Sequence, residues 1–328
     1  MLFCILNVQY DIHLYQTQYH YIHATGEWSF ELDKKDCIVF YLITTGGISI
    51  KVDDVYRNAH ARDVVMVPGG KKHLICGVGQ SDIPSIDIAP LLSNQTVETI
   101  HLGKPAIHSK GDEPAQTTEM VAIVCHYDRE ITRPLLSALP KILPESESND
   151  EQKMIMLDLG VKFLALESEQ NRLGKMTIIN RIASILMIEC VRNYIEDLPE
   201  ATDNWLKAVK DPYLAKALAV MHDRPETNWT IHKLAEVAGM SRSSFAEHFR
   251  EVVGVPPLTY LTDYRLRLAA RYLRLQENSI SRISELVGYA SDSTFSQAFK
   301  RVYKMSPRKY RQSFRTEGVH FADSLGEQ

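Results

Sequence analysis

The chain of 328 residues lacks the features that mark membrane, secreted and disulfide-rich proteins. It has no run of eighteen apolar residues, so no membrane-spanning helix is expected. The apolar start, Met1–Val8, has neither a basic leader nor a small-residue cleavage site, and we interpret it as a first strand. The five cysteines are odd in number and widely spaced, without a close pair that suggests zinc or redox chemistry. A reduced, cytoplasmic environment is therefore predicted.

Charge is divided unevenly along the chain. From Trp205 to Arg315 there are 19 Lys and Arg against 10 Asp and Glu, a net charge of +9. The remainder has 18 against 31, a net charge of −13, so the overall value of −4 hides a basic segment joined to an acidic one. The length also favours two domains. A basic domain can gain affinity for nucleic acid by releasing counterions from phosphates, and an acidic neighbour limits non-specific binding.

The last third of the chain contains one helical unit twice. Residues Thr230–Leu261 form the first copy and Ser281–Arg311 the second. The pairs that match at a constant spacing of 50 are Phe245 and Phe295, Phe249 and Phe299, Arg250 and Lys300, Pro257 and Pro307, and Tyr260 and Tyr310. Each copy is predicted to be a helix, a short turn containing glycine, and a second helix, which is the layout of a helix-turn-helix.

Capping residues and apolar spacing define the helices of each copy. Thr230 and Ser241 suit N-caps, because their hydroxyls accept otherwise unpaired N–H groups, and Gly239 suits a left-handed helix end. Pro256 and Pro257 are expected to end the second helix of the first copy. In the second copy Gly288 turns the chain and Ser291 or Asp292 caps. The inward-facing residues predicted for the two second helices are Phe245, Phe249, Val252, Phe295, Phe299 and Val302.

A single helix is predicted between the copies. The apolar spacing from Leu261 to Leu275 is helical, and this segment also contains four arginines. Such a connector would fix the distance between the two second helices. Those helices could then enter successive major-groove segments about one helical turn, roughly 34 Å, apart.

Residues Leu234–Leu273 and Ile283–Arg311 resemble the AraC/XylS-type DNA-binding domain, and the resemblance covers about a third of the chain. It implies a regulator, more often an activator than a repressor, that binds promoter DNA and works with RNA polymerase. It places base-contacting residues on the outer faces of the second helices. Those residues are Ser243, Ser244, Glu247, Asp292, Ser293, Ser296 and Gln297. The residues we predict at phosphates are Arg242, Arg250, Arg265, Lys300 and Arg301.

The sequence departs from the family pattern at three outer-face positions, which are Ala246, Glu247 and Gln297. Ala246 cannot hydrogen-bond a base, and Glu247 prefers a cytosine amino group. Many relatives have arginine where this chain has Gln297, whose amide recognises adenine well. The first copy is therefore expected to contribute modest base recognition.

The first half of the chain is predicted to be rich in short strands. Cys37–Ile43 has the composition of a buried strand, Ile48–Val52 alternates apolar and polar residues, and Val64–Val67 follows. This spacing indicates a β-sandwich or barrel. Further along, Met120–Tyr127 is a predicted strand, whereas Gln95–Thr118 is mostly polar and is expected to be irregular.

Residues Arg62–Asp63, Pro68, Gly70 and His73 resemble the second motif of the cupin barrel. The resemblance implies a cupin-like sensor domain that receives an unidentified small-molecule effector in its mouth. His73 stands at a metal-ligand position, but the His-x-His and Glu that would complete the set are missing before the turn at Gly46–Gly47. Enzyme sites need about three protein ligands, so no metal, cofactor or catalytic residue is predicted. His73 is a candidate effector ligand, or simply a residue of the barrel mouth or a turn.

Two helices are predicted from Glu151 to Leu198, split near Asn171–Gly174. The second has an apolar stripe that forms a dimer interface in one interpretation and packs on the barrel in the other. Related regulators often dimerise through such a pair, which favours a homodimer. The predicted fold class is α+β in two domains, a cupin-like barrel with a helical pair and an all-α double helix-turn-helix. The predicted segments are 1–145 for the barrel, 146–198 for the helical pair, 199–210 for a linker, 211–315 for the DNA-binding domain and 316–328 for a tail.

Three functions compete at this point. The first is a cytoplasmic, sequence-specific transcription regulator controlled by an effector in the barrel. The second is a cupin-type metalloenzyme with a helical appendage, which the missing ligands disfavour. The third is a ligand-independent DNA-binding protein with a vestigial barrel.

Overall fold

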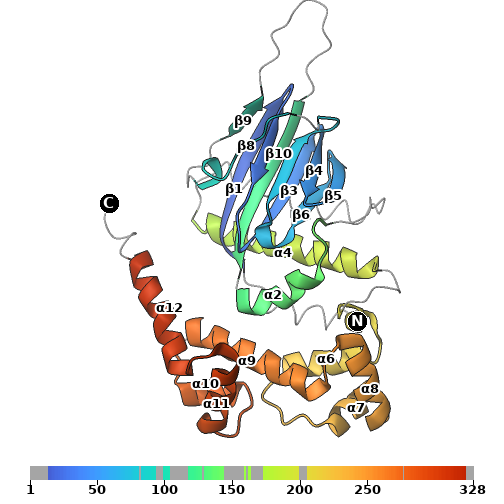
Figure 1. Cartoon of the computed structure of the whole chain (residues 1–328), viewed down its shortest axis with the longest axis vertical. Coiled ribbons are helices and arrows are strands. Elements are labelled where there is room, and N and C mark those ends of the chain that lie inside the picture. The colour runs from blue at the N-terminus through green and yellow to red at the C-terminus, as the bar shows by residue number, and fades with distance from the viewer. Residues whose placement is uncertain are drawn as a thin grey trace, which may run out of the picture. The chain divides into compact units, whose positions relative to one another are not determined.

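The computed structural model describes residues 14–80, 83–93, 99–103, 117–127, 129–143, 159, 162–163, 173–198, 205–275 and 277–322. The chain divides into two compact units, formed mainly by residues 12–197 and 198–328. The first is built largely of strands and the second of helices (Figure 1). The predicted α+β class in two domains is confirmed. Each unit is described separately below.

Two five-stranded sheets form the first unit. Their strand orders are β6-β3-β10-β1-β9 and β5-β4-β7-β2-β8. Most neighbours are antiparallel, while β1 pairs with β9 and β2 with β8 in parallel. The strands are β1 (Leu14–Thr25), β2 (Ser29–Leu32), β3 (Cys37–Thr45), β4 (Gly47–Val52), β5 (Val55–His60), β6 (Val64–Val67), β7 (His73–Gly77), β8 (Ile86–Asp87), β9 (Ile100–Gly103) and β10 (Thr117–Tyr127).

One apolar core lies between the two sheets. Alternate residues of β1, such as Ile22 and Ala24, share it with Tyr41 of β3 and Phe30 of β2. The ring of Phe30 stacks on Trp28 at 6.1 Å between centroids. The period-two alternation therefore has the expected physical meaning, with one face of each sheet buried against the other. The backbone hydrogen-bond ladders of the described strands stay within each sheet, giving a sandwich without showing closure into a barrel.

The strand predictions were partly right. β3, β4 and β6 contain the segments predicted from Cys37 to Val67, and β10 begins three residues before the predicted Met120. The expectation of an irregular Gln95–Thr118 is wrong for two parts of it, because Ile100–Gly103 forms β9 against β1 and β10 starts at Thr117. Backbone pairing with a long neighbouring strand overrides the weak local pattern there. The strand predicted at Met1–Val8 lies outside the described residues.

Helix α4 (Lys175–Glu196) packs against β1 and β10, and crosses one end of the strands in Figure 1. The side-chain oxygen of Asn180 accepts a hydrogen bond from the Thr17 backbone N–H at 3.2 Å. This is the second helix of the predicted pair, whereas the first lies mostly outside the described residues. Another helix, α2 (Arg129–Ala138), follows β10. None of the described helices is both long and apolar enough to cross a membrane.

The second unit is a series of helices around two apolar cores. Phe245 and Phe249 lie in the first core with residues up to Leu261, while Phe295 and Phe299 lie in the second. The helices are α5 (Lys207–Lys210), α6 (Leu214–Asp223), α7 (Ile231–Ala238), α8 (Arg242–Val253), α9 (Pro257–Leu275), α10 (Ile280–Leu286), α11 (Asp292–Tyr303) and α12 (Pro307–Ala322). The packed unit extends further toward the N-terminus than the predicted boundary at 211, because Leu206, Ala208 and Val209 are buried.

Two details of the helix ends differ from the predictions. Helix α8 ends at Gly254, in the left-handed conformation with φ of 85°, before the two prolines. Pro257 is instead the first residue of α9, a position where its missing N–H costs nothing. Val302 was predicted to face inward but is 46% exposed, because Phe295 and Phe299 already fill the inner face of α11.

His222 is a buried histidine at the meeting point of the two helical cores. Its ring stacks on Tyr264 at 4.3 Å between centroids, and its Nε2 lies 2.9 Å from the Tyr260 hydroxyl. Nδ1 has no hydrogen-bond partner among the described residues. Burial, and then the charge of Arg267, lower the pKa of His222 to about 3.

We predict that this histidine makes the helical unit sensitive to mild acid. An unfolded histidine binds a proton near pH 6.5, while folded His222 stays neutral down to about pH 3. Its contribution to stability is therefore present above pH 6.5 and is lost as the pH falls toward 3, by up to about 1.4 kcal/mol per pH unit. Denaturant unfolding of the full chain at pH 7, 6 and 5 should show a flatter profile for His222→Gln. Parallel profiles would contradict the prediction.

Candidate DNA interface

Helices α8 and α11 occupy equivalent positions in the two helix-turn-helix units. The predicted caps are confirmed, since the Ser241 hydroxyl accepts the N–H of Ser244 and the Ser291 hydroxyl accepts the N–H of Thr294, both at 3.2 Å. In the first helix-turn-helix unit, Thr230 caps the start of α7 and Gly239 ends that helix with a φ of 72°. Each second helix thus begins at a defined residue, and its phenylalanines fix its rotation about its own axis.

The structure leaves the predicted base-contacting residues on the faces opposite the phenylalanines. On α8, Ser243, Ser244 and Glu247 are exposed. On α11, Asp292, Ser293 and Gln297 are exposed, and Ser296 is half-buried. Positions three and four apart on a helix lie on one face, so each set forms a continuous polar strip. We call these two strips the recognition faces, because they contain the residues predicted to contact bases.

Four of the five predicted phosphate-contacting residues are exposed beside the recognition faces. They are Arg242, Arg250, Lys300 and Arg301. The prediction missed a further exposed basic group that follows α11, formed by Lys304, Arg308 and Lys309. Five basic residues between positions 300 and 309 were the available signal. The first turn of α12 adds helix N–H groups next to this basic group, an arrangement that favours anions.

Arg265, the fifth, is held inside the unit. Its Nε donates to the Pro225 carbonyl at 2.7 Å and its Nη2 donates to the Thr227 carbonyl at 2.8 Å. The side chain is half-buried. Its guanidinium is thereby engaged with backbone oxygens of the loop between α6 and α7, and we omit it from the proposed phosphate contacts.

His73, the candidate effector ligand, has both ring nitrogens in contact with protein groups. Nδ1 lies 2.6 Å from the Lys71 carbonyl and must donate there, and Nε2 then accepts from the Tyr41 hydroxyl at 2.7 Å. Burial lowers the pKa of His73 to about 4 and raises the pKa of Tyr41 well above 10. The pair is a neutral, internally satisfied contact between β7 and β3. This arrangement supports the structural alternative for His73.

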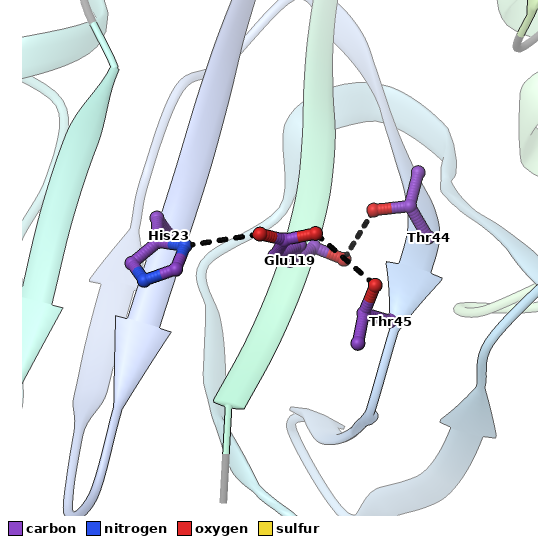
Figure 2. Close-up of polar contacts among 4 residues, drawn as sticks. All are labelled: His23, Thr44, Thr45 and Glu119. Carbon is purple, nitrogen blue, oxygen red and sulfur yellow. Dashed lines mark hydrogen bonds and ion pairs between the residues drawn. The ribbon is translucent and has the colours of Figure 1, made fainter.

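A second polar group of the strand unit lies on the outer face of its first sheet. Figure 2 shows Glu119 of β10 between His23 of β1 and the threonines of β3. Its carboxylate lies 3.2 Å from His23 Nδ1 and accepts from the Thr45 hydroxyl at 3.1 Å, while its carbonyl accepts from Thr44. These contacts join three neighbouring strands. Across the described residues, no group of three or more His, Cys, Asp or Glu side chains is arranged to hold a metal ion.

The cysteines that the structure describes are free and buried. Burial raises the pKa of Cys37, Cys125 and Cys190 to about 12. These thiols are therefore protonated at neutral pH and behave as small core residues.

Both units of the chain are similar to known protein families. A family profile described as a helix-turn-helix domain covers residues 234–313, and one described as cupin covers residues 10–196. The transcriptional regulator AlkR of Acinetobacter baylyi is 34% identical over 304 residues, which are 92% of this chain and 96% of AlkR. The chain belongs to the AraC-type helix-turn-helix transcriptional regulators with a cupin N-terminal domain. Both family resemblances are thus confirmed, and the AraC-type regulator is a DNA-binding protein.

The chain is also similar to a second regulator and to a solved DNA-binding domain. The activator RclR of Escherichia coli, whose name describes it as RCS-specific, is 33% identical over 60% of this chain and 70% of its own. The DNA-binding domain of AdpA in complex with a target DNA is 28% identical over 33% of this chain and 96% of that one, with a TM-score of 0.31.

We predict that the cap of α8 stabilises the helical unit of this AraC-type regulator. Ser241→Ala removes the acceptor for the Ser244 N–H and should lower the free energy of unfolding by about 1 kcal/mol. Ser243→Ala, at an exposed position two residues later, should change it by less than about 0.5 kcal/mol. Denaturant unfolding of both variants measures the difference. Equal stabilities of Ser241→Ala and Ser243→Ala would argue against the cap.

Proposed function

We propose that this AraC-type regulator recognises a bipartite promoter site by placing α8 and α11 in two successive major-groove segments. The observation that supports this most is the pair of exposed recognition faces, which occur at equivalent positions on two helices joined by α9. A phenylalanine core beneath each helix turns its polar strip outward. The net charge of +9 in this region provides the attraction to phosphates.

Base recognition in the proposed complex rests mainly on α11. The amide of Gln297 is long enough to bond adenine N6 and N7 together, and Asp292, Ser293 and Ser296 lie on the same side. On α8, Glu247 is the one long polar side chain of the predicted set, and it would accept from a cytosine amino group. The remaining α8 side chains, Ser243 and Ser244, are short. The DNA segment contacted by α11 is therefore expected to be recognised more specifically than the segment contacted by α8.

Gln297→Ala should weaken binding at one base pair only. We expect the preference for adenine at that position to fall by about 1–3 kcal/mol, while preferences elsewhere stay unchanged. Arg301→Ala serves as the matched control, because loss of a phosphate contact weakens binding to all sequences about equally and lowers the salt slope by about 1. Competition binding against a library of single-base variants tests both. A uniform effect of Gln297→Ala would show that Gln297 recognises no base.

We propose that the cupin domain receives a small-molecule effector and that its binding alters DNA binding. The relative RclR is named an activator, which supports activation, with RNA polymerase as the partner, as the mode of action. The internally satisfied His73 and the absence of a three-residue metal group among the described side chains favour a sensor over a metalloenzyme. The same role places the protein in the cytoplasm, where promoters and polymerase meet. An effector must bind two states unequally to shift their populations.

A homodimer through α4 is part of this proposal. Ile178 and Ile185 are 38% and 50% exposed, and they lie seven residues apart on one face of the helix. Side chains on the opposite side, such as Ala183 and Met187, are buried. A helix that is apolar on both sides has one face to pack on its own sheet and a second to bury elsewhere.

The double substitution Ile178→Glu and Ile185→Glu should convert a dimer to a monomer without unfolding the strand unit. Placing carboxylates in an apolar interface costs several kcal/mol, whereas both positions tolerate a charged side chain when they are exposed to water in the monomer. Analytical ultracentrifugation measures the mass. Thr177→Glu, at an exposed polar position of the same helix, should remain dimeric. A wild-type protein that sediments as a monomer would refute the dimer.

The main proposal is tested by selecting bound DNA from a random pool and then measuring binding of the selected sequence over a series of salt concentrations. Full-length protein should enrich a motif spanning about two helical turns and retain selectivity as salt rises. Binding without a motif that collapses with salt would indicate phosphate contacts alone. Removing residues 1–198 tests the ligand-independent alternative, under which regulation would survive the deletion.

A further inference from the structure

The two helix-turn-helix units meet at a junction in which Arg265 is central. Their apolar cores are separate, and α9 contributes Leu261 to the first and Tyr264 onward to the second. Arg265 is the next residue of α9. Its two hydrogen bonds, at 2.7 and 2.8 Å, end on Pro225 and Thr227, in the loop between α6 and α7 that leads into the first helix-turn-helix unit.

The second unit reaches the same junction through the turn of its helix-turn-helix. Gly288 has a φ of 78°, and a Cβ atom there would lie 2.7 Å from Arg265 Nη2 and 2.8 Å from the Glu226 backbone. The turn at Gly288 therefore lies against both Arg265 and the loop between α6 and α7. A side chain at 288 would push these three groups apart, so glycine is required there for space as well as for conformation.

We propose that Arg265 is a positioning residue that fixes the angle between the two helix-turn-helix units, and with it the spacing of the two DNA segments that one chain recognises. The inference rests on the proposed bipartite recognition. A planar guanidinium that donates from Nε and Nη2 to two carbonyls has its orientation fixed, which a single contact would not achieve. Both helix-turn-helix units are held at one point beside α9. A small change in the angle between them at this point therefore produces a larger displacement of the recognition faces.

A rigid junction has a measurable consequence for spacing. One inserted base pair moves the second segment by about 3.4 Å and rotates it by roughly a tenth of a turn. A fixed pair of recognition helices cannot follow this change, whereas two loosely joined units can. The effective concentration of the second unit at its segment also falls when the junction loosens.

The experiment measures affinity of the full chain for duplexes that carry both segments at the preferred spacing or with one or two base pairs inserted or deleted. Wild-type protein should lose at least about 10-fold in affinity for each altered spacing. Arg265→Ala should bind the preferred spacing about 10-fold more weakly and distinguish the spacings by less than about 3-fold. Arg265→Lys keeps the charge but not the two-pronged geometry, and should show the same loss of spacing selectivity with an unchanged salt slope.

Arg282→Ala is the matched control, because Arg282 is an exposed arginine of α10 that pairs with Glu285, and it should keep the wild-type spacing profile. Equal losses at every spacing, with a salt slope lowered by about 1, would overturn the inference and make Arg265 a phosphate contact. A lower melting temperature with an unchanged spacing profile would also overturn it, leaving Arg265 a stabilising residue only. A wild-type protein indifferent to spacing would instead refute bipartite recognition itself, and the inference with it.

Discussion

Burial of two phenylalanine pairs is the interaction on which the DNA-binding unit depends. Phe245 with Phe249, and Phe295 with Phe299, lie four residues apart and are fully buried. Burying each ring contributes about 1.5–3 kcal/mol, and it also decides which side of α8 and α11 faces water. Because the phenylalanines occupy the buried side of each helix, Ser243, Ser244, Ser293, Glu247 and Gln297 lie on the exposed side. Stability and the proposed DNA recognition thus depend on the same helical periodicity.

The two units differ in how their polar residues are used. In the strand unit, His73 joins the two sheets through its contact with Tyr41, and Glu119 joins neighbouring strands of one sheet. In the helical unit, Ser243 and Gln297 point away from the core and remain available to a partner. The difference fits the proposed regulator, in which the recognition faces are exposed before DNA is bound. It leaves the proposed effector to be recognised by groups other than His73.

Sequence patterns alone predicted most of the helical unit, since its information is local. Caps at Thr230, Ser241 and Ser291 act within one turn, and the repeat at a spacing of 50 reveals both cores at once. The strand unit was less predictable. β9 owes its existence to β1, a partner far away in the sequence, and Ile100–Gly103 has too few residues to display a clear alternation.

The sequence by itself determined the family, the helices α8 and α11 and the faces that they expose, because hydrophobic periodicity and capping depend on near neighbours. Only the tertiary structure decided the roles of Arg265 and His73. Four arginines on α9 look alike in the sequence, and only folding brings the carbonyls of Pro225 and Thr227 to Arg265. Likewise, only the packing of one sheet against the other places Tyr41 of β3 against His73 of β7. A side chain's function depends on which groups surround it, and those groups come from distant parts of the chain.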